Sequence, residues 1–358
     1  MLWIVLKWVG LVLAALVIVV IGFVTIARIT TYFANRITSE NGIDESVYVP
    51  LGGQEQYLRI RGKDRGNPVI VWLHGGPGGP DGFLYHVFSK YLVADYTIVS
   101  WDQRGCGKTY YHNRKTDPTN ETVSFRQAME DLDQLVDYVR ERFEVEKVIL
   151  VGHSYGTMPG SKYALENPLK VEAYIGIGQV VTMESEIYSY QDALAKARDL
   201  GRDTKAMEDA YKDFMAEKSL LNKVNLRRFV YPYHIPPKQA NQIWLALLSP
   251  YLGVDNIRWF LKANTDVQEY IKLNQPLFDY LDETDVRDYG LEYQVPVGFI
   301  SGSEDWSTPV KYVEDYYEMI TAPKKSIYQL KDCGHSPQMD APEEFCKVLK
   351  GMLEEYLN

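Results

Sequence analysis

The chain has 358 residues, 46% of them hydrophobic and 24% charged, so it is long enough to bury one large core or two smaller ones. Its formal net charge of −10 argues against binding to nucleic acid, because little positive charge is left to follow a phosphate backbone. The three cysteines stand at scattered spacings and do not indicate a disulfide framework.

The first apolar segment, residues 8–27, carries no charge and is long enough to cross the ~30 Å hydrocarbon core as a helix. A cleaved signal peptide is the alternative, but its apolar region would be shorter and would end at a small-x-small cleavage site. We therefore expect residues 1–37 to form an uncleaved, single-pass membrane anchor. Lys7 precedes the segment and Arg28 follows it, so the positive charges leave the side of the membrane open.

After a polar linker at residues 38–44, alternating apolar and polar residues at 47–61 predict a β-hairpin that turns at Gly52 and Gly53. Further along, short apolar runs that predict strands alternate with stretches of helical period. The predicted strands cover residues 68–73, 96–101, 148–153 and 171–177, and the predicted helices cover 124–143 and about 157–167. This alternation predicts an α/β fold with a mainly parallel sheet covered on both faces.

Between residues 182 and 293 the strand pattern disappears and helical stretches replace it. They cover residues 187–200, 203–218, 236–248, 255–262 and 267–281, with prolines at their ends, including Pro276. Strands at 297–300 and 326–330 and helices at 309–319 and 342–357 then complete the α/β pattern. We expect residues 38–181 and 294–358 to form the core, and residues 182–293 to form a helical cap over it.

The most informative motif is Gly152-His-Ser-Tyr-Gly156, which joins an apolar strand to a helix. This arrangement is typical of a nucleophile elbow, in which a serine stands on a sharp turn between strand and helix. The glycines leave room where a Cβ would collide across the turn. Ser154 is therefore the candidate nucleophile. An ordinary strand-to-helix turn is the alternative.

A serine hydroxyl needs a base to take its proton, and the base needs a third group to orient it. In sheets of this kind the chain order is serine, acid, histidine. His335 follows the last predicted strand and is the candidate base, although a loop histidine is often only structural. Asp305 follows the resumed strand within an Asp-x-x-Thr-Pro pattern and is the candidate acid, with the adjacent Glu304 as its rival.

Two backbone N–H groups are needed to stabilise the oxyanion of a tetrahedral intermediate. We expect one from Tyr155, directly after the nucleophile, and the other from Gly76 in the glycine-rich loop at residues 74–79. A tight turn that requires positive φ angles would explain the same glycines.

Together these motifs resemble the proline iminopeptidase family of α/β-hydrolases, the S33-type serine peptidases. The resemblance runs from about residue 45 to the end of the chain, with five motifs in the family's order: His74-Gly-Gly-Pro-Gly-Gly79, Asp102-Gln-Arg-Gly-Cys-Gly107, Gly152-His-Ser-Tyr-Gly156, Asp305-Trp-Ser-Thr-Pro309 and Gly334-His335. It implies an α/β-hydrolase fold with an inserted cap, an acyl-enzyme on Ser154, and no cofactor or metal. It also implies a short peptide or other small molecule as substrate.

Family members that remove N-terminal residues hold the free amine with cap carboxylates. Glu184 and Glu186 lie near the start of the predicted cap and are the candidates for this role. Glu208, Glu217 and Glu269 are rivals, and an acidic residue on a cap helix is most often only solvated. The elbow also departs from the Gly-Gly-Ser-Trp-Gly of many iminopeptidases, and its form here is common in esterases.

Our first hypothesis is therefore a membrane-anchored serine hydrolase that cleaves small peptides or amides at their N-terminus. A carboxylesterase or acyl-lipid hydrolase with the same three residues is the second hypothesis. The anchor and the apolar cap residues Trp244, Leu247 and Phe260 favour it, although core packing is the usual explanation of such residues. The third, of a different class, is an inactive binding module on the same fold.

Overall fold

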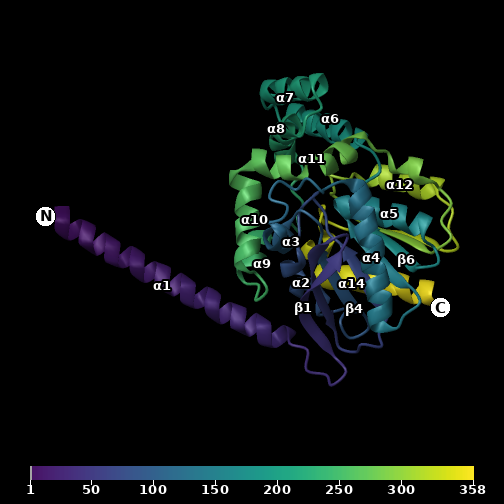
Figure 1. Cartoon of the computed structure of the whole chain (residues 1–358). Helices are drawn as coiled ribbons and strands as arrows, with labels where there is room; N and C mark the ends of the chain where they lie inside the picture. The colour runs from purple at the N-terminus through teal and green to yellow at the C-terminus, as the bar shows by residue number, and fades with distance from the viewer. Residues whose placement is uncertain (1) are drawn as a thin grey trace.

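A mixed β-sheet forms the centre of the globular part in the computed structural model, which describes residues 2–358 (Figure 1). Its strands are β1 (Ile43–Leu51), β2 (Gln54–Gly62), β3 (Val69–Leu73), β4 (Thr97–Asp102), β5 (Val148–His153), β6 (Val171–Ile177), β7 (Val297–Gly302) and β8 (Lys325–Leu330). Within the described residues their order is β1-β2-β4-β3-β5-β6-β7-β8. β2 pairs antiparallel with β1 and β4, and the pairings from β4 through β8 are parallel. The predicted mainly parallel sheet is confirmed.

Alternate residues of the central strands enter two different apolar clusters, one on each face of the sheet. In β3, Val71 packs in the cluster with α4 (Phe125–Phe143), while Trp72 packs in the cluster with α14 (Pro342–Leu357). This division follows from the period of two along a strand. The remaining helices of the core are α2 (His86–Ser89), α3 (Gly107–Asn113), α5 (Thr157–Glu166), α12 (Val310–Met319) and α13 (Pro337–Asp340).

The N-terminal helix α1 (Leu2–Asn35) extends away from the globular part (Figure 1). Over Val5–Asn35 it is long and apolar enough to cross a membrane, with a mean hydropathy of 3.1. It is longer than the predicted charge-free segment because helical sequence continues past Arg28. The predicted polar linker is also shorter than expected, because β1 already begins at Ile43, which is buried in the core.

Between β6 and β7 the chain forms helices that lie over one edge of the sheet (Figure 1). They are α6 (Glu184–Asp199), α7 (Lys205–Ala216), α8 (Leu220–Val230), α9 (Gln242–Leu247), α10 (Val254–Thr265) and α11 (Val267–Glu283). We refer to these six helices as the cap. Their position agrees with the expected insertion, whose exact boundaries stay a prediction.

Three details of the cap differ from the sequence predictions. The helix expected over residues 236–248 is shorter, because α9 begins only at Gln242. Helix α8 was not expected, because its sequence is rich in polar residues; it forms where Leu226 and Val230 pack against Phe214 of α7 and where the Ser219 side chain caps its first turn. Pro276 was expected at a helix end but lies inside α11. A proline removes one N–H donor from a helix, and here the packing of Leu273 and Leu277 on either side keeps the helix continuous.

Candidate active site

Ser154 stands on a sharp turn between β5 and α5, at the edge of the sheet beneath the cap. Its φ angle is +52°, in the left-handed region that a non-glycine residue rarely adopts. The turn is close-packed, since a Cβ at Gly156 would lie 2.2 Å from the carbonyl oxygen of Leu73. The predicted strand, turn and helix are all present around the serine.

The side chains of Ser154, His335 and Asp305 form a continuous hydrogen-bonded chain, although they come from three distant parts of the sequence. His335 follows β8, and its Nε2 lies 2.8 Å from Ser154 Oγ. On the other side of the ring, His335 Nδ1 lies 2.8 Å from Asp305 Oδ2 and 3.1 Å from Oδ1. Because an ionised carboxylate can only accept, Nδ1 carries the proton and Nε2 is free to accept one from the serine.

Asp305 is held ionised and fixed in place by donors around it. Ser307 N and Thr308 N donate to its Oδ1 at 2.9 and 3.0 Å, and Thr308 Oγ1 donates to its Oδ2 at 2.8 Å. Burial by itself would raise the pKa of Asp305, but His335 and the Thr308 donors outweigh it and hold the pKa below its ordinary value. The rival Glu304 is exposed, and among the described residues the carboxylate that pairs with His335 is that of Asp305.

A second histidine supports the loop that carries His335. His153 Nε2 lies 2.8 Å from the backbone carbonyl oxygen of His335, to which it donates. Burial, and after it the nearby His335, lowers the pKa of His153 to about 4. His153 is therefore neutral near pH 7 and acts as a positioning group that adds no charge beside His335.

The glycine-rich loop after β3 passes directly beside the serine. A Cβ at Gly75 would lie 2.9 Å from Ser154 Cβ, and Gly76 has a φ angle of +119° that only glycine adopts readily. Both Gly76 and Tyr155, the two predicted oxyanion donors, line the same cavity as Ser154. The absence of side chains brings the loop backbone close to the serine.

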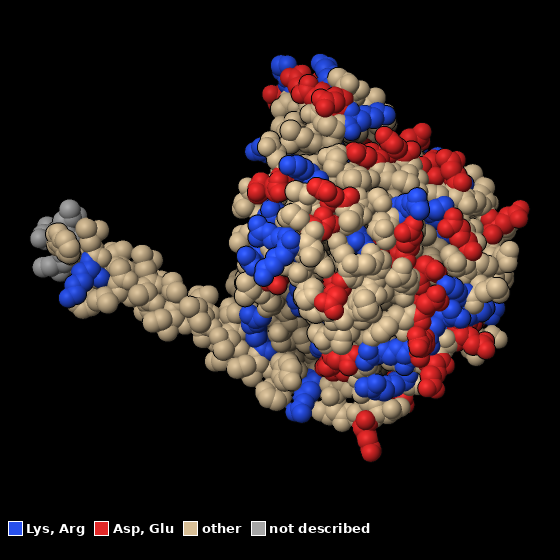
Figure 2. Space-filling model, viewed as in Figure 1, with Lys and Arg blue, Asp and Glu red and all other residues tan. Residues whose placement is uncertain are grey.

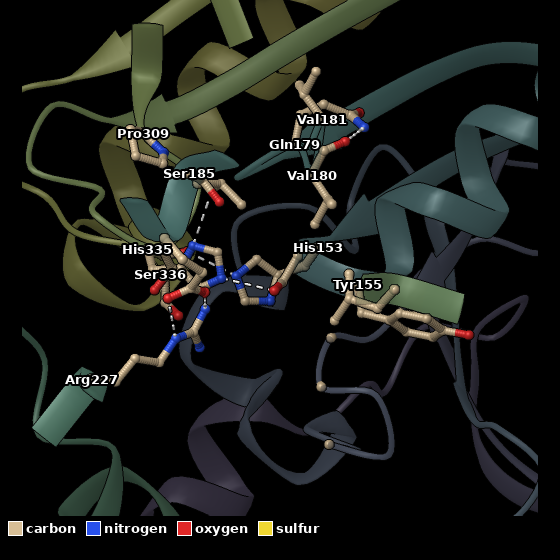
Figure 3. A pocket seen from close by; sticks show the side chains of 18 of the residues that line it. His153, Tyr155, Gln179, Val180, Val181, Ser185, Arg227, Pro309, His335 and Ser336 are labelled. Atoms are coloured by element: carbon tan, nitrogen blue, oxygen red, sulfur yellow. Dashed lines mark hydrogen bonds and ion pairs between the residues drawn. The ribbon is translucent and has the colours of Figure 1, made fainter. Parts of the chain in front are cut away.

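The cavity above Ser154 has a volume of about 330 Å³ and is closed on one side by the cap. Of the two predicted cap carboxylates, Glu186 lines this cavity, whereas Glu184 is exposed and lines a neighbouring hollow. Both oxygens of Glu186 pair with Arg227 of α8, whose guanidinium reaches toward the side of the cavity that holds His335 and Ser336 (Figure 3).

Several polar residues of the cavity were not identified from the sequence. Arg227 and Lys223 lie on the unexpected helix α8, and Lys223 is buried in an ion pair with Asp282. Asp81 and Gln338 also line the cavity. Asp81 comes two residues after the glycine-rich loop and Gln338 three residues after His335, so proximity to these motifs was the available signal.

A serine on a strand-to-helix turn, a histidine after the last strand and an acid after the preceding strand define a hydrolase of the α/β class. The chain belongs to the α/β hydrolase fold family, whose profile matches residues 68–342. The predictions of this fold and of a hydrolytic enzyme are confirmed at the level of the family.

Individual relatives also agree with the predicted resemblance to proline iminopeptidases. The probable aminopeptidase YbaC of Bacillus subtilis is 26% identical over 319 residues, which cover 86% of this chain and 95% of the relative. A proline iminopeptidase structure from Mycobacterium smegmatis superposes with a TM-score of 0.62 at 19% identity, over 87% of this chain and 98% of that one. A membrane phospholipase A structure matches over 100% of both chains with a TM-score of 0.57 at 19% identity. At such identities the two structures show a shared fold.

Proposed function

We propose that this protein is a membrane-anchored serine hydrolase of the proline iminopeptidase or aminopeptidase type, which hydrolyses small peptides or amides. The observation that carries the proposal is the chain of hydrogen bonds from Asp305 through His335 to Ser154, which opens on a cavity of substrate size. The names of the curated relatives support the peptidase assignment.

In the proposed reaction, Ser154 Oγ attacks the carbonyl carbon of the substrate while its proton passes to His335 Nε2. The oxyanion that forms accepts hydrogen bonds from the backbone N–H groups of Gly76 and Tyr155. The C–N bond then breaks, and His335 gives its proton to the departing amine. Water attacks the resulting ester on Ser154, losing one proton to His335, which returns it to Ser154 as the acid product leaves.

The anchor is proposed on the length and apolar character of α1. Residues 8–27 would lie in the hydrocarbon core, and the globular part would sit at the membrane surface. The cap carboxylate that remains a candidate for binding the substrate is Glu186, because it lines the cavity; Glu184 lies outside it.

The experiment is a substrate panel on the full-length protein in detergent, with proline, alanine and leucine p-nitroanilides beside simple esters. Turnover of at least one anilide, lost in Ser154→Ala, is the expected result. Brisk ester hydrolysis with no anilide turnover would reject the peptidase assignment. Absence of covalent labelling by a fluorophosphonate probe would favour the inactive binding module.

A carboxylesterase or acyl-lipid hydrolase is the second candidate. It is favoured by the membrane phospholipase A among the similar structures, which aligns over the whole chain. It is also favoured by the apolar side chains that the cap exposes on α9 and α10. Esters with long acyl chains, added to the same panel, distinguish it from the peptidase.

A further inference from the structure

Helices α9 and α10 of the cap expose large apolar side chains that do not pack into the core. These residues are all exposed to solvent, and they lie on two helices that follow each other in the chain. They are Ile243, Trp244, Leu247, Val254, Ile257, Phe260 and Leu261. The exposed fraction is 61% at Ile243 and 71% at Val254. We call these seven residues the apolar face. Exposure of this many large apolar groups together is unfavourable in water and marks a surface that is covered by something else.

Within α10 the pattern is that of a helix with one apolar stripe. Val254, Ile257 and Leu261 follow the spacing i, i+3, i+7, while Trp259 points inward and donates its indole N–H to Gly78 O at 2.8 Å. The buried side of α10 thus already packs against the hydrolase core, next to Cys106 and Tyr110, and the exposed side is a separate apolar surface.

A hydrogen bond fixes this face at the level where α1 leaves the membrane. Arg28 is the first charged residue after the apolar segment 8–27, and so marks the boundary between hydrocarbon and headgroups. Its Nη2 donates to the carbonyl oxygen of Leu252 at 2.6 Å. Leu252 lies in the connection between α9 and α10, so α9 ends and α10 begins close to that boundary.

The views of the whole molecule agree with this placement. α9 and α10 lie on the flank of the globular part toward which α1 projects (Figure 1). On that flank, Lys and Arg side chains lie among uncharged surface and some acidic side chains (Figure 2). Arg258 of α10 is half-exposed beside the apolar stripe and pairs with Asp255 at 3.3 Å, and its remaining N–H groups face outward where lipid phosphate can accept from them.

We infer that the apolar face of α9 and α10 inserts into the interfacial region of the bilayer that α1 enters. The cap is then a second point of membrane contact. Gln242, which precedes Ile243, lines the cavity above Ser154, so the inserted face begins one residue from the cavity. This inference rests on the proposed anchoring by α1 and goes beyond it.

The test places an environment-sensitive NBD label on single introduced cysteines of the full chain in vesicles of phosphatidylcholine and phosphatidylglycerol. Ile243→Cys and Val254→Cys report on the apolar face. Leu221→Cys on α8 is the matched control, being an apolar cap residue of similar exposure, 54%, on a helix that lies farther from the point where α1 joins the globular part (Figure 1). The native Cys106, Cys333 and Cys346 are buried, and labelling of the unmodified protein measures any background.

We expect lipids with a nitroxide near the headgroup to quench the labels at 243 and 254 about threefold more strongly than the label at 221. Equal weak quenching at all three positions, in protein that still floats with the vesicles, would overturn the inference while leaving the anchor intact. Failure of the protein to float with the vesicles would overturn the proposed anchor instead, and the inference with it.

A second and independent observation concerns the lining of the cavity above Ser154. Asp81 Oδ1 and Gln338 Oε1 are buried and, among the described residues, neither has a hydrogen-bond partner. Both residues line the cavity, and Leu84 and Met339, which neighbour them in sequence, pack in one apolar cluster. Asp81 precedes a 3₁₀ turn (Gly82–Leu84), but its side chain does not cap it.

Two buried acceptors without donors suit a ligand that brings N–H groups and positive charge. Glu186 is a weaker candidate for this, because both of its oxygens already accept from Arg227. The geometry points to Asp81, assisted by Gln338, as the group that binds the ammonium of an amine-bearing substrate. This assignment rests on the proposed function. Burial raises the pKa of Asp81 to about 7 against the opposing effect of the Tyr85 hydroxyl, which lowers it, and nearby Asp102 adds a smaller increase; a bound cation would favour the ionised form.

The test compares kcat/KM for alanine methyl ester and N-acetylalanine methyl ester, because both a peptidase and an esterase turn over such esters. In Asp81→Asn we expect the preference for the free amine, measured as the ratio of the two kcat/KM values, to fall about tenfold. Equal losses on both esters would show a merely structural role. A preference lost in Glu186→Gln and kept in Asp81→Asn would place the amine at Glu186. Neither result depends on whether anilides are cleaved.

Discussion

The replacement Asp305→Asn tests whether the carboxylate orients His335 by the geometry described above. Asparagine keeps the size of the side chain, and its Oδ1 can still accept from Ser307 N and Thr308 N. Its amide nitrogen, however, would face His335 Nδ1, where the carboxylate now accepts at 2.8 Å. An amide N–H donates, so the imidazole would have to carry its proton on Nε2, which could then no longer accept from Ser154.

The expected cost follows from this change of tautomer and from the loss of a negative charge beside the imidazolium. For a triad of this geometry the loss in kcat is about 10⁴-fold, which corresponds to an increase of about 5 kcal/mol in the activation free energy. KM should change little, because Asp305 is buried beneath His335 and does not line the cavity.

The assay is kcat on whichever substrate of the panel is turned over best, together with the rate of labelling by a fluorophosphonate. Glu304→Gln is the matched control, since it removes a charge from the adjacent, exposed residue and should leave both rates within about twofold. Activity of Asp305→Asn within tenfold of the unmodified protein, with a large loss in Glu304→Gln, would refute the assignment of the acid.

Four further predictions follow from other contacts of the site. Ser154→Ala should abolish fluorophosphonate labelling without lowering the unfolding temperature by more than a few degrees; residual labelling would point to a different nucleophile. Activity should fall at acid pH because protonated His335 cannot accept from Ser154, so any residual activity of His335→Gln should lack that acid limb. Arg227→Met should lower the free energy of unfolding by about 2 kcal/mol, because it leaves the buried Glu186 unpaired while Arg227 itself is about one-third exposed. Urea unfolding measures this, with the double variant Glu186→Gln/Arg227→Met as control. A double variant no more stable than Arg227→Met alone would contradict the prediction. The folded-state pKa of Asp81, raised to about 7, lies above the unfolded value of about 3.9, so its contribution to stability is present at low pH and lost as pH rises through 7. The free energy of unfolding of Asp81→Asn should therefore rise relative to that of the unmodified protein between pH 5 and pH 8. A difference in unfolding free energy that stays constant over this range would refute the raised pKa of Asp81.

Much of the core could be predicted because its signals are local. The turn at Ser154 needs small residues at Gly152 and Gly156, and an apolar run before it forms the buried strand β5. The order of Ser154, Asp305 and His335 along the chain follows from parallel strands whose carboxyl ends meet at one edge of the sheet. These features depend on residues within a few positions of one another, or on a topology that alternating strands and helices imply.

The cap was less predictable. Helix α8 carries few regularly spaced apolar residues and is held by contacts with α6 and α7, so its own sequence did not reveal it. The consequence was functional as well as structural, because α8 carries Arg227, and Arg227 occupies both oxygens of Glu186.

The sequence by itself determined the fold class, the apolar N-terminal helix and the residues that meet at the edge of the sheet. Only the tertiary structure decided which cavity groups are already paired and which are free, and that α9 and α10 turn apolar side chains outward beside α1. The physical reason is that a hydrogen bond such as Arg28 to Leu252 joins residues 224 positions apart. Local periodicity carries no trace of such a contact, because it depends on how whole helices pack.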